Sequence, residues 1–246
     1  MRTQFDQIAS QYRDVKKTLT RRFIVEPTFL KLIGSVQGKK VLDLACGEGH
    51  YTRLLKKKGA SKVYGIDISR NQIKISKEIE NKNKLDLQYF VGDGANFIFS
   101  KIEKLDLITA VFLLHYADSK EKLFKMCKNI YDALNENGKF VTINGNPDFV
   151  IQSDKKYEVT TSAESPLQEG TIRRVNYFFE GKELCSFDTY IWKKETYKEA
   201  LKKAGFVNIK WLPVIVSKEG NDKFGKQFWK DFLANPYIIG LTCEKE

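Results

Sequence analysis

The chain has 246 residues, of which 42% are hydrophobic, and a formal net charge of +11. This length suits one domain with a single large core. The four cysteines are scattered and there are only two histidines, so the sequence disfavours a disulfide framework and predicts no metal site. No apolar run follows the first residues, and no apolar stretch is long enough for a bilayer. We therefore expect a cytoplasmic protein without a membrane partner.

The positive charge could mark a nucleic-acid surface. The lysines, however, are spread along the chain and interleaved with acids, as in KEIENKNK at 77–84. A solvated, lysine-rich surface explains this pattern better, which disfavours nucleic acid as a partner. A homodimer stays open.

In chain order, helical periodicity predicts an N-terminal arm at 5–17 and a helix at 27–35. The first strand is expected at 40–45, and the second ends at residue 67. Three more strands are expected at 87–91, 106–112 and 139–144. The capping patterns Ser69-x-x-Gln72 and Asp118-x-x-Glu121 begin two of the intervening helices, the second at 120–135. This alternation predicts a mostly parallel sheet with helices on both faces.

The alternation breaks after the fifth strand. Residues 156–192 contain three β-rich runs, and Glu180-Gly181 between the last two suits a hairpin turn. A helix at 195–204, ended by Gly205, returns to the core. We expect one domain over 1–246, made of an arm (1–38), a core (39–146 and 193–246) and an inserted antiparallel β lobe (147–192) that covers the substrate.

The segment VLDLACGEG at 41–49 predicts a strand, a glycine turn with Gly47 and Gly49, and then a helix. This geometry places a nucleotide-like ligand at a helix N-terminus, and Asp67, eighteen residues after Gly49, suits ribose hydroxyls. A dinucleotide fingerprint is excluded because Thr52 replaces its third glycine, and no P-loop occurs. Carboxylates such as Asp43 suit a cofactor with ammonium and sulfonium groups.

The stretch VLDLACGEGHYTRLL resembles motif I of the class I S-adenosylmethionine-dependent methyltransferases. Segments resembling the family's later motifs follow in order: YGIDIS (64–69), YFVGDGANF (89–97), DLITAVFLLHYADS (106–119) and NENGKFVTING (135–145). The C-terminal region resembles the family's antiparallel sixth and seventh strands. The resemblance implies a Rossmann-like seven-stranded sheet of order 3-2-1-4-5-7-6 and S-adenosyl-L-methionine as the cofactor.

The resemblance also implies that Asp67 binds the ribose and Asp93 the adenine amino group. The arm FDQIASQYRDVK resembles a family segment whose tyrosine folds over the cofactor, so Tyr12 is a candidate gate, although simple packing on the core is the alternative. The expected cofactor-binding residues are Tyr12, Asp43, Ala45, Gly47, Gly49, Asp67, Ile68, Gly92, Asp93, Gly94, Ala95 and Phe112.

The expected catalytic residues are His115 and Tyr116, which follow the fourth strand. The ordinary pKa of histidine suits a general base, and Asp118 could orient the imidazole. Alternatively, His115 is only a hydrogen-bonded wall of the pocket.

Four further residues are expected to bind the substrate. Asn144 and Asn146 follow the fifth strand, where amides suit a polar heterocycle, although turn chemistry around Pro147 is the alternative. Tyr177 and Tyr190 could line the inner face of the lobe, where aromatic residues are more often core.

Three further segments are FLLHYADSKEKL (112–123), VTINGNP (141–147) and the tail WLPVIVSKEGNDKFGKQFWKDFLANPYIIGLTCEK (211–245). Their combination resembles the toxoflavin synthase-like enzymes of this superfamily, which implies methylation of a nitrogen, or an oxygen, of a small heterocyclic metabolite. An RNA or DNA methyltransferase is the first alternative, but the fourth strand lacks the Asn/Asp-Pro-Pro-aromatic motif for base amino groups. A non-catalytic partner subunit that binds the cofactor is the second.

Overall fold

A computed structural model describes residues 6, 14–96, 102–151, 155–164 and 166–246, to which all structural statements refer. The larger sheet consists of β1 (Lys40–Leu44), β2 (Lys62–Asp67), β3 (Leu87–Val91), β4 (Leu105–Val111), β5 (Leu134–Gly145), β9 (Val207–Leu212) and β10 (Ile238–Glu244). The smaller sheet consists of β6 (Val159–Ala163), β7 (Ile172–Phe179) and β8 (Lys182–Tyr190). The helical segments are η1 (Arg21–Val25), α3 (Glu26–Ile33), α4 (His50–Lys57), α5 (Arg70–Asn83), η3 (Leu114–Tyr116), α6 (Lys120–Ala133), α7 (Lys194–Ala204), α8 (Lys218–Phe224), η4 (Lys226–Trp229) and α9 (Lys230–Ala234).

The larger sheet has the order β3-β2-β1-β4-β5-β10-β9. Strands β1 to β5 pair in parallel, whereas β10 runs antiparallel between β5 and β9. This confirms the expected seven-stranded Rossmann-like sheet with its antiparallel last pair. Because the parallel strands end at one edge, the loops after β1, β2, β3 and β4 meet there.

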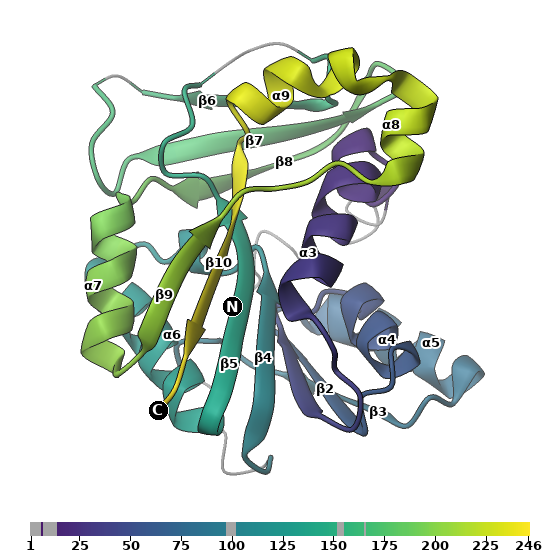
Figure 1. Cartoon of the computed structure of the whole chain (residues 1–246), viewed down its shortest axis with the longest axis vertical. Helices are drawn as coiled ribbons and strands as arrows, with labels where there is room; N and C mark the ends of the chain where they lie inside the picture. The colour runs from purple at the N-terminus through teal and green to yellow at the C-terminus, as the bar shows by residue number, and fades with distance from the viewer. Residues whose placement is uncertain (1–5, 7–13, 97–101, 152–154, 165) are drawn as a thin grey trace.

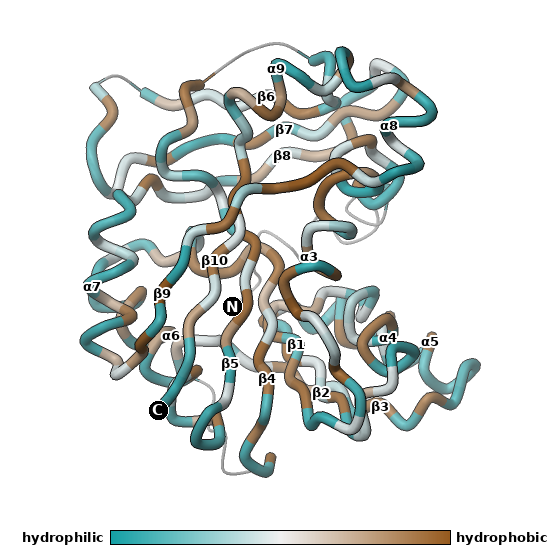
Figure 2. Tube along the Cα trace, viewed as in Figure 1, coloured by the Kyte–Doolittle hydropathy of each residue, from teal (hydrophilic) through white to brown (hydrophobic). Residues whose placement is uncertain are grey.

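Side chains that alternate along each strand build a core on both faces of this sheet. On one face Val41 and Leu107 pack with Phe29 of α3. On the other face Leu42 and Ile108 belong to a second cluster with residues of α6 and α7. In Figure 2 the central strands are accordingly more hydrophobic than the outer helices.

The inserted lobe is a separate sheet of order β6-β7-β8, which confirms that the β-rich runs pair outside the main sheet. In Figure 1 it lies across the edge where the parallel strands end, flanked by α8 and α9. The pairing of Phe179 with Lys182 leaves Glu180 and Gly181 as a two-residue turn. Their φ angles of 50° and 79° match the expected hairpin, since such turns require positive φ.

Two helix boundaries differ from the expectation. The N-cap of α6 is Ser119, not Asp118: the Ser119 Oγ accepts a hydrogen bond from the backbone N–H of Lys122. Helix α3 is preceded directly by the π-helical turn η1, so the helical segment begins before Pro27. Proline has no N–H for the carbonyl four residues earlier, and the Phe23 carbonyl accepts instead from the Ser217 N–H at 2.8 Å.

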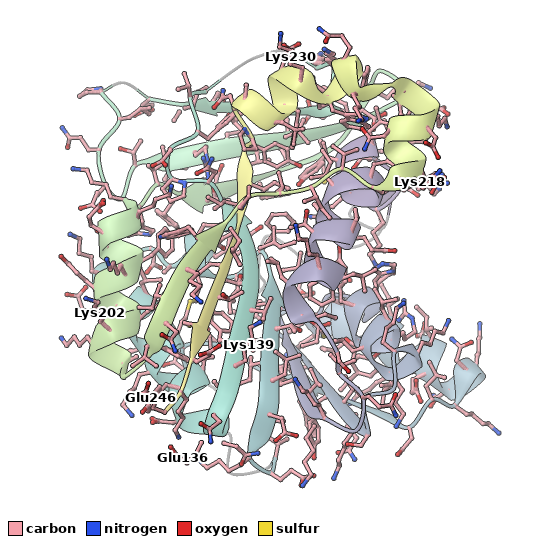
Figure 3. All side chains as sticks on the ribbon, in the orientation of Figure 1. Glu136, Lys139, Lys202, Lys218, Lys230 and Glu246 are labelled. Carbon is pink, nitrogen blue, oxygen red and sulfur yellow. The ribbon has the colours of Figure 1, made fainter. Side chains whose placement is uncertain are left out.

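The surface is rich in lysine on several sides of the molecule. Lys202 on α7, Lys218 on α8 and Lys230 on α9 extend away from the ribbon in different directions (Figure 3). The four cysteines are buried and none forms a disulfide. Within the described residues, no helix combines the length and apolar character that crossing a membrane requires.

Candidate active site

The turn after β1 has the geometry that the glycine pattern predicts. Ala45, Gly47 and Gly49 have φ angles of 60°, 56° and 82°. A Cβ on Gly49 would lie 2.2 Å from the Tyr89 hydroxyl oxygen, so this position excludes any side chain. The turn can therefore lie close to β3 and bring its backbone to the edge of the sheet.

Asp67, the last residue of β2, joins this turn to the neighbouring loop. Its carboxylate accepts hydrogen bonds from the backbone N–H groups of Gly47 and Ser69, both at 2.8 Å. Burial raises its pKa to about 6, against the opposing effect of these two hydrogen bonds. The carboxylate has further lone pairs for a ligand, because each oxygen can accept more than one hydrogen bond.

Asp93 lies in the loop after β3, beside Asp67. The Gly92 N–H donates to the Asp67 carbonyl at 2.9 Å. The Asp93 carboxylate accepts from the backbone N–H of Ala95 at 2.9 Å and from the Asn96 side chain at 3.0 Å. These contacts fix the carboxylate at the wall of one cavity with Asp67.

That cavity has a volume of about 290 Å³, near the lower end of the range for small-molecule sites. Its walls are Leu44, Ala45, Gly47, Asp67, Ile68, Gln72, Gly92, Asp93, Gly94, Val111, Phe112, Leu113, Tyr116, Asp118, Lys122, Met126, Asp188 and Tyr190. We refer to it as the main cavity. It brings together most of the residues expected to bind the cofactor, with Tyr116 and Tyr190 from the expected catalytic and substrate sets.

Three expected cofactor residues do not line the main cavity. Asp43 is 1% exposed, and its carboxylate accepts from the Thr52 hydroxyl at 2.7 Å and the Thr109 hydroxyl at 3.4 Å. It therefore ties β1 to α4 and β4 below the turn. Gly49 packs against Tyr89, and Ala95 is buried in the core. Tyr12 lies outside the described residues.

Neither carboxylate of the VLDLACGEG segment lines the main cavity. Glu48 forms an ion pair with Lys16 at 2.5 Å, and Asp43 lies below the turn. The carboxylates in the cavity walls belong to Asp67, Asp93, Asp118 and Asp188. Because Asp118 pairs with Lys122 and Asp188 with Arg174, the expected residues Asp67 and Asp93 supply the negative charge that suits a cationic ligand.

Of the two expected catalytic residues, His115 is the one that lies outside the main cavity. It is 3% exposed and does not line the main cavity. Its Nδ1 lies 2.7 Å from the Asn144 Oδ1, whereas Asp118 forms an ion pair with Lys122. Burial, assisted by the charge of Arg173, lowers the pKa of His115 to about 3. A base this weak gives little help in deprotonation near neutral pH.

The expected substrate residues divide between two places. Tyr190 lines the main cavity, whereas Tyr177 is buried beside His115 in a smaller one. Asn144 bonds to His115, and the Asn146 side chain donates to the Pro236 carbonyl at 2.9 Å. Both asparagine side chains therefore connect segments of the protein. For Asn146 this agrees with the alternative that the residue serves the turn around Pro147.

Some residues of the main cavity carried no functional signal in the sequence. Lys122 and Met126 lie one turn apart on α6, a spacing that could have indicated a shared face. Asp188 reaches the cavity from β8, and only the packing of the lobe against the core decides that position.

The described residues fit S-adenosylmethionine. The carboxylate of Asp67 can accept from ribose hydroxyls and that of Asp93 from an adenine amino group. The open turn at Gly47 admits a ligand close to the backbone, because a Cβ there would have only the Gln72 side chain within 4 Å, at 3.8 Å. The acidic walls complement the positive sulfonium and ammonium groups.

Residues 41–138 match the protein family described as Methyltransferase domain. This part of the chain is therefore similar to methyltransferase domains, and the fold is the one found in solved S-adenosylmethionine-dependent methyltransferases. A solved S-adenosylmethionine-dependent methyltransferase from Clostridium acetobutylicum shares the fold with a TM-score of 0.66, at 19% identity over 96% of this chain and 98% of that one.

Among curated relatives, an uncharacterized protein of Haemophilus influenzae is 30% identical over 63% of this chain and 64% of its own length. A ubiquinone biosynthesis O-methyltransferase of Coxiella burnetii is 28% identical over 58% of this chain and 61% of its own length. The chain thus spans somewhat less than two thirds of these relatives.

Proposed function

We propose that this protein transfers the methyl group of S-adenosylmethionine to a nitrogen, or an oxygen, of a small heterocyclic metabolite, as the resemblance to toxoflavin synthase-like enzymes implies. The observation that carries this proposal is the main cavity, in which Gly47, Asp67 and Asp93 face Tyr190 and Asp188 of the lobe. The name of the Coxiella burnetii relative supports oxygen as the alternative acceptor atom.

The residues of the main cavity divide into two groups by position. Asp67 and Asp93 would hold the cofactor, which supplies an electrophilic methyl group when bound. Tyr116, Asp188 and Tyr190 would contact the acceptor, because they lie where β4 and the lobe meet. The lobe strands over the cavity would exclude water and orient the acceptor, which are the main contributions a protein makes to in-line displacement.

Proton removal is not assigned to His115. Tyr116 is the expected catalytic residue that lines the main cavity, and its hydroxyl can both donate and accept a hydrogen bond. We assign it the role of orienting the acceptor. An acceptor that is already deprotonated near neutral pH would need no base.

Two measurements test the proposed function. Calorimetry should detect binding of S-adenosylhomocysteine to the wild type, with clear loss of affinity in Asp67→Ala and none in Asp222→Ala on the exposed surface of α8. Labelled methyl groups from S-adenosylmethionine should then enter small molecules of a cell extract. Label found only in RNA or protein would contradict the proposal, and cofactor binding without any transfer would favour the partner-subunit alternative. The homodimer and the cytoplasmic location stay predictions.

A further inference from the structure

Arg173 on β7 is a buried cation at the boundary between the lobe and the core. Arg173 is 6% exposed, and its Nε has no hydrogen-bond partner within the described residues. No carboxylate of those residues forms an ion pair with it, and burial lowers the pKa of its guanidinium. A buried charge without a counter-ion is costly, so this site is built for an anion.

Arg173 lines a second cavity of about 20 Å³, which we refer to as the small cavity. Thr161 lines it too, with its buried Oγ1 unpaired among the described residues. His115 and Gly145 line it as well. A Cβ on Gly145 would lie 2.4 Å from an Arg173 terminal nitrogen, so only glycine admits the guanidinium here.

The small cavity adjoins the main cavity. Phe112 lines both, and the Tyr116 ring, in the wall of the main cavity, lies 6.2 Å from the Phe187 ring of the small one. Phe112 has a φ of 69°, a conformation that a bulky residue adopts only under constraint. Phe112, directly after β4, is therefore a wall that the two spaces share.

A second cation strengthens the positive potential at this point. The guanidinium of Arg21 lies 4.2 Å from the centre of the Phe112 ring and 5.5 Å from that of Tyr177. Burial lowers the pKa of His115, and the charges of Arg173 and Arg21 lower it further.

We propose that Arg173 binds a carboxylate of the methyl acceptor, whose nucleophilic atom then reaches the main cavity past Phe112. This inference rests on the proposed function and narrows its substrate class to small carboxylic acids. A planar carboxylate matches the fork of a guanidinium, and the small cavity suits such a group better than a bulkier phosphate. The carboxylate is held and not methylated, because Arg173 lines the small cavity and not the main cavity, where the cofactor residues lie.

The direct test uses acetate as a probe and acetamide as its uncharged counterpart. With S-adenosylhomocysteine present, acetate should shift the NMR signal of the Arg173 Nε–H in a saturable way, and acetamide should bind at least about tenfold more weakly. Arg173→Gln should abolish the shifts that acetate produces around His115 and Gly145. Arg174→Gln, which removes the next charge on the same strand, should preserve them.

Two further variants keep the test decisive if Arg173→Gln does not fold. Arg173→Lys keeps the charge without the planar fork and should weaken acetate binding. Gly145→Ala should do the same, since the added methyl group displaces the guanidinium. Acetate shifts that are absent, or that are equal in all variants, would overturn the inference.

The proposed function and this inference can fail separately. S-adenosylhomocysteine should bind Arg173→Gln as tightly as the wild type, and loss of that affinity would show that Arg173 serves the cofactor site or the fold, which contradicts the inference. A labelled product from a cell extract should carry a carboxylate. A labelled small molecule without one would contradict the inference and still support methyl transfer.

Discussion

The Asp67 carboxylate accepts a hydrogen bond from the Gly47 backbone N–H at 2.8 Å, so the end of β2 holds the turn that follows β1. Both residues line the main cavity. The turn and the carboxylate therefore act as one unit, and a change in either should affect the same ligand.

Asp67→Ala should weaken the binding of S-adenosylhomocysteine by about 2 kcal/mol, or ~30-fold, because a charged acceptor for two hydroxyl groups is lost. Calorimetry on folded protein measures this change. Asp222→Ala, on an exposed helix, is the control for loss of one carboxylate. An Asp67→Ala protein with wild-type affinity would remove this residue from the ligand site.

The affinity of the wild type for S-adenosylhomocysteine should also depend on pH. Burial raises the pKa of Asp67 to about 6, and the ionised form is the better acceptor. Affinity should therefore be constant above pH ~7 and fall as the pH drops through about 6. Asp67→Asn should bind weakly at every pH, without this transition. If the two proteins show the same pH dependence, another group is responsible.

Asp43→Asn should stabilise the protein at alkaline pH. Burial raises the pKa of Asp43 to about 7, so the folded state holds a proton that the unfolded state releases. The free energy of unfolding of the wild type therefore loses a contribution as pH rises from about 4 to 7. The variant lacks this loss and should exceed the wild type by up to about 4 kcal/mol at pH ~8.

Denaturant titrations at acidic and alkaline pH measure this difference, which should nearly vanish at pH ~4. Because Asp43 does not line the main cavity, the variant should bind S-adenosylhomocysteine like the wild type. A strong loss of affinity would return Asp43 to the ligand-binding set that the sequence predicts.

Gly49→Ala should be far more destabilising than Gly181→Ala in the hairpin turn, although the two glycines have φ angles of 82° and 79°. A Cβ on Gly181 would have no heavy atom within 4 Å, so that variant incurs only the conformational cost of about 1 kcal/mol. A Cβ on Gly49 would also collide with Tyr89, which should add about 2 kcal/mol or more. Equal stabilities in denaturant titration would contradict the close packing of the turn on β3.

The His115 imidazole should not titrate between pH ~5 and ~8, because burial lowers its pKa to about 3. In His50→Gln, His115 is the chain's remaining histidine, so its NMR signals need no further assignment. A chemical-shift transition in this range would restore His115 as a candidate base. Without such a transition, the pH dependence of methyl transfer must come from other groups.

The sequence by itself determines the alternation of strands and helices, the glycine turn and the place of Asp67 at the end of β2, whereas the strand order and the place of Asp93 come from the family resemblance. The first three features follow from local rules: alternation of apolar residues, the positive φ of Gly47 and Gly49, and the meeting of parallel strand ends at one edge. Each of these rules depends on residues that are neighbours in the chain or on the regular geometry of a sheet. The linear pattern of residues is therefore enough to predict these features.

Only the tertiary structure decides what surrounds His115 and Arg173. The contact of His115 with Asn144 joins residues 29 positions apart, and Arg173 reaches Gly145 only because the lobe packs across the edge of the sheet. Burial of this kind changes the chemistry of a side chain: the same imidazole that suggests a base in the sequence lies buried, with a lowered pKa, in the wall of the small cavity that Arg173 also lines. No local pattern encodes that environment, since it depends on how two sheets dock.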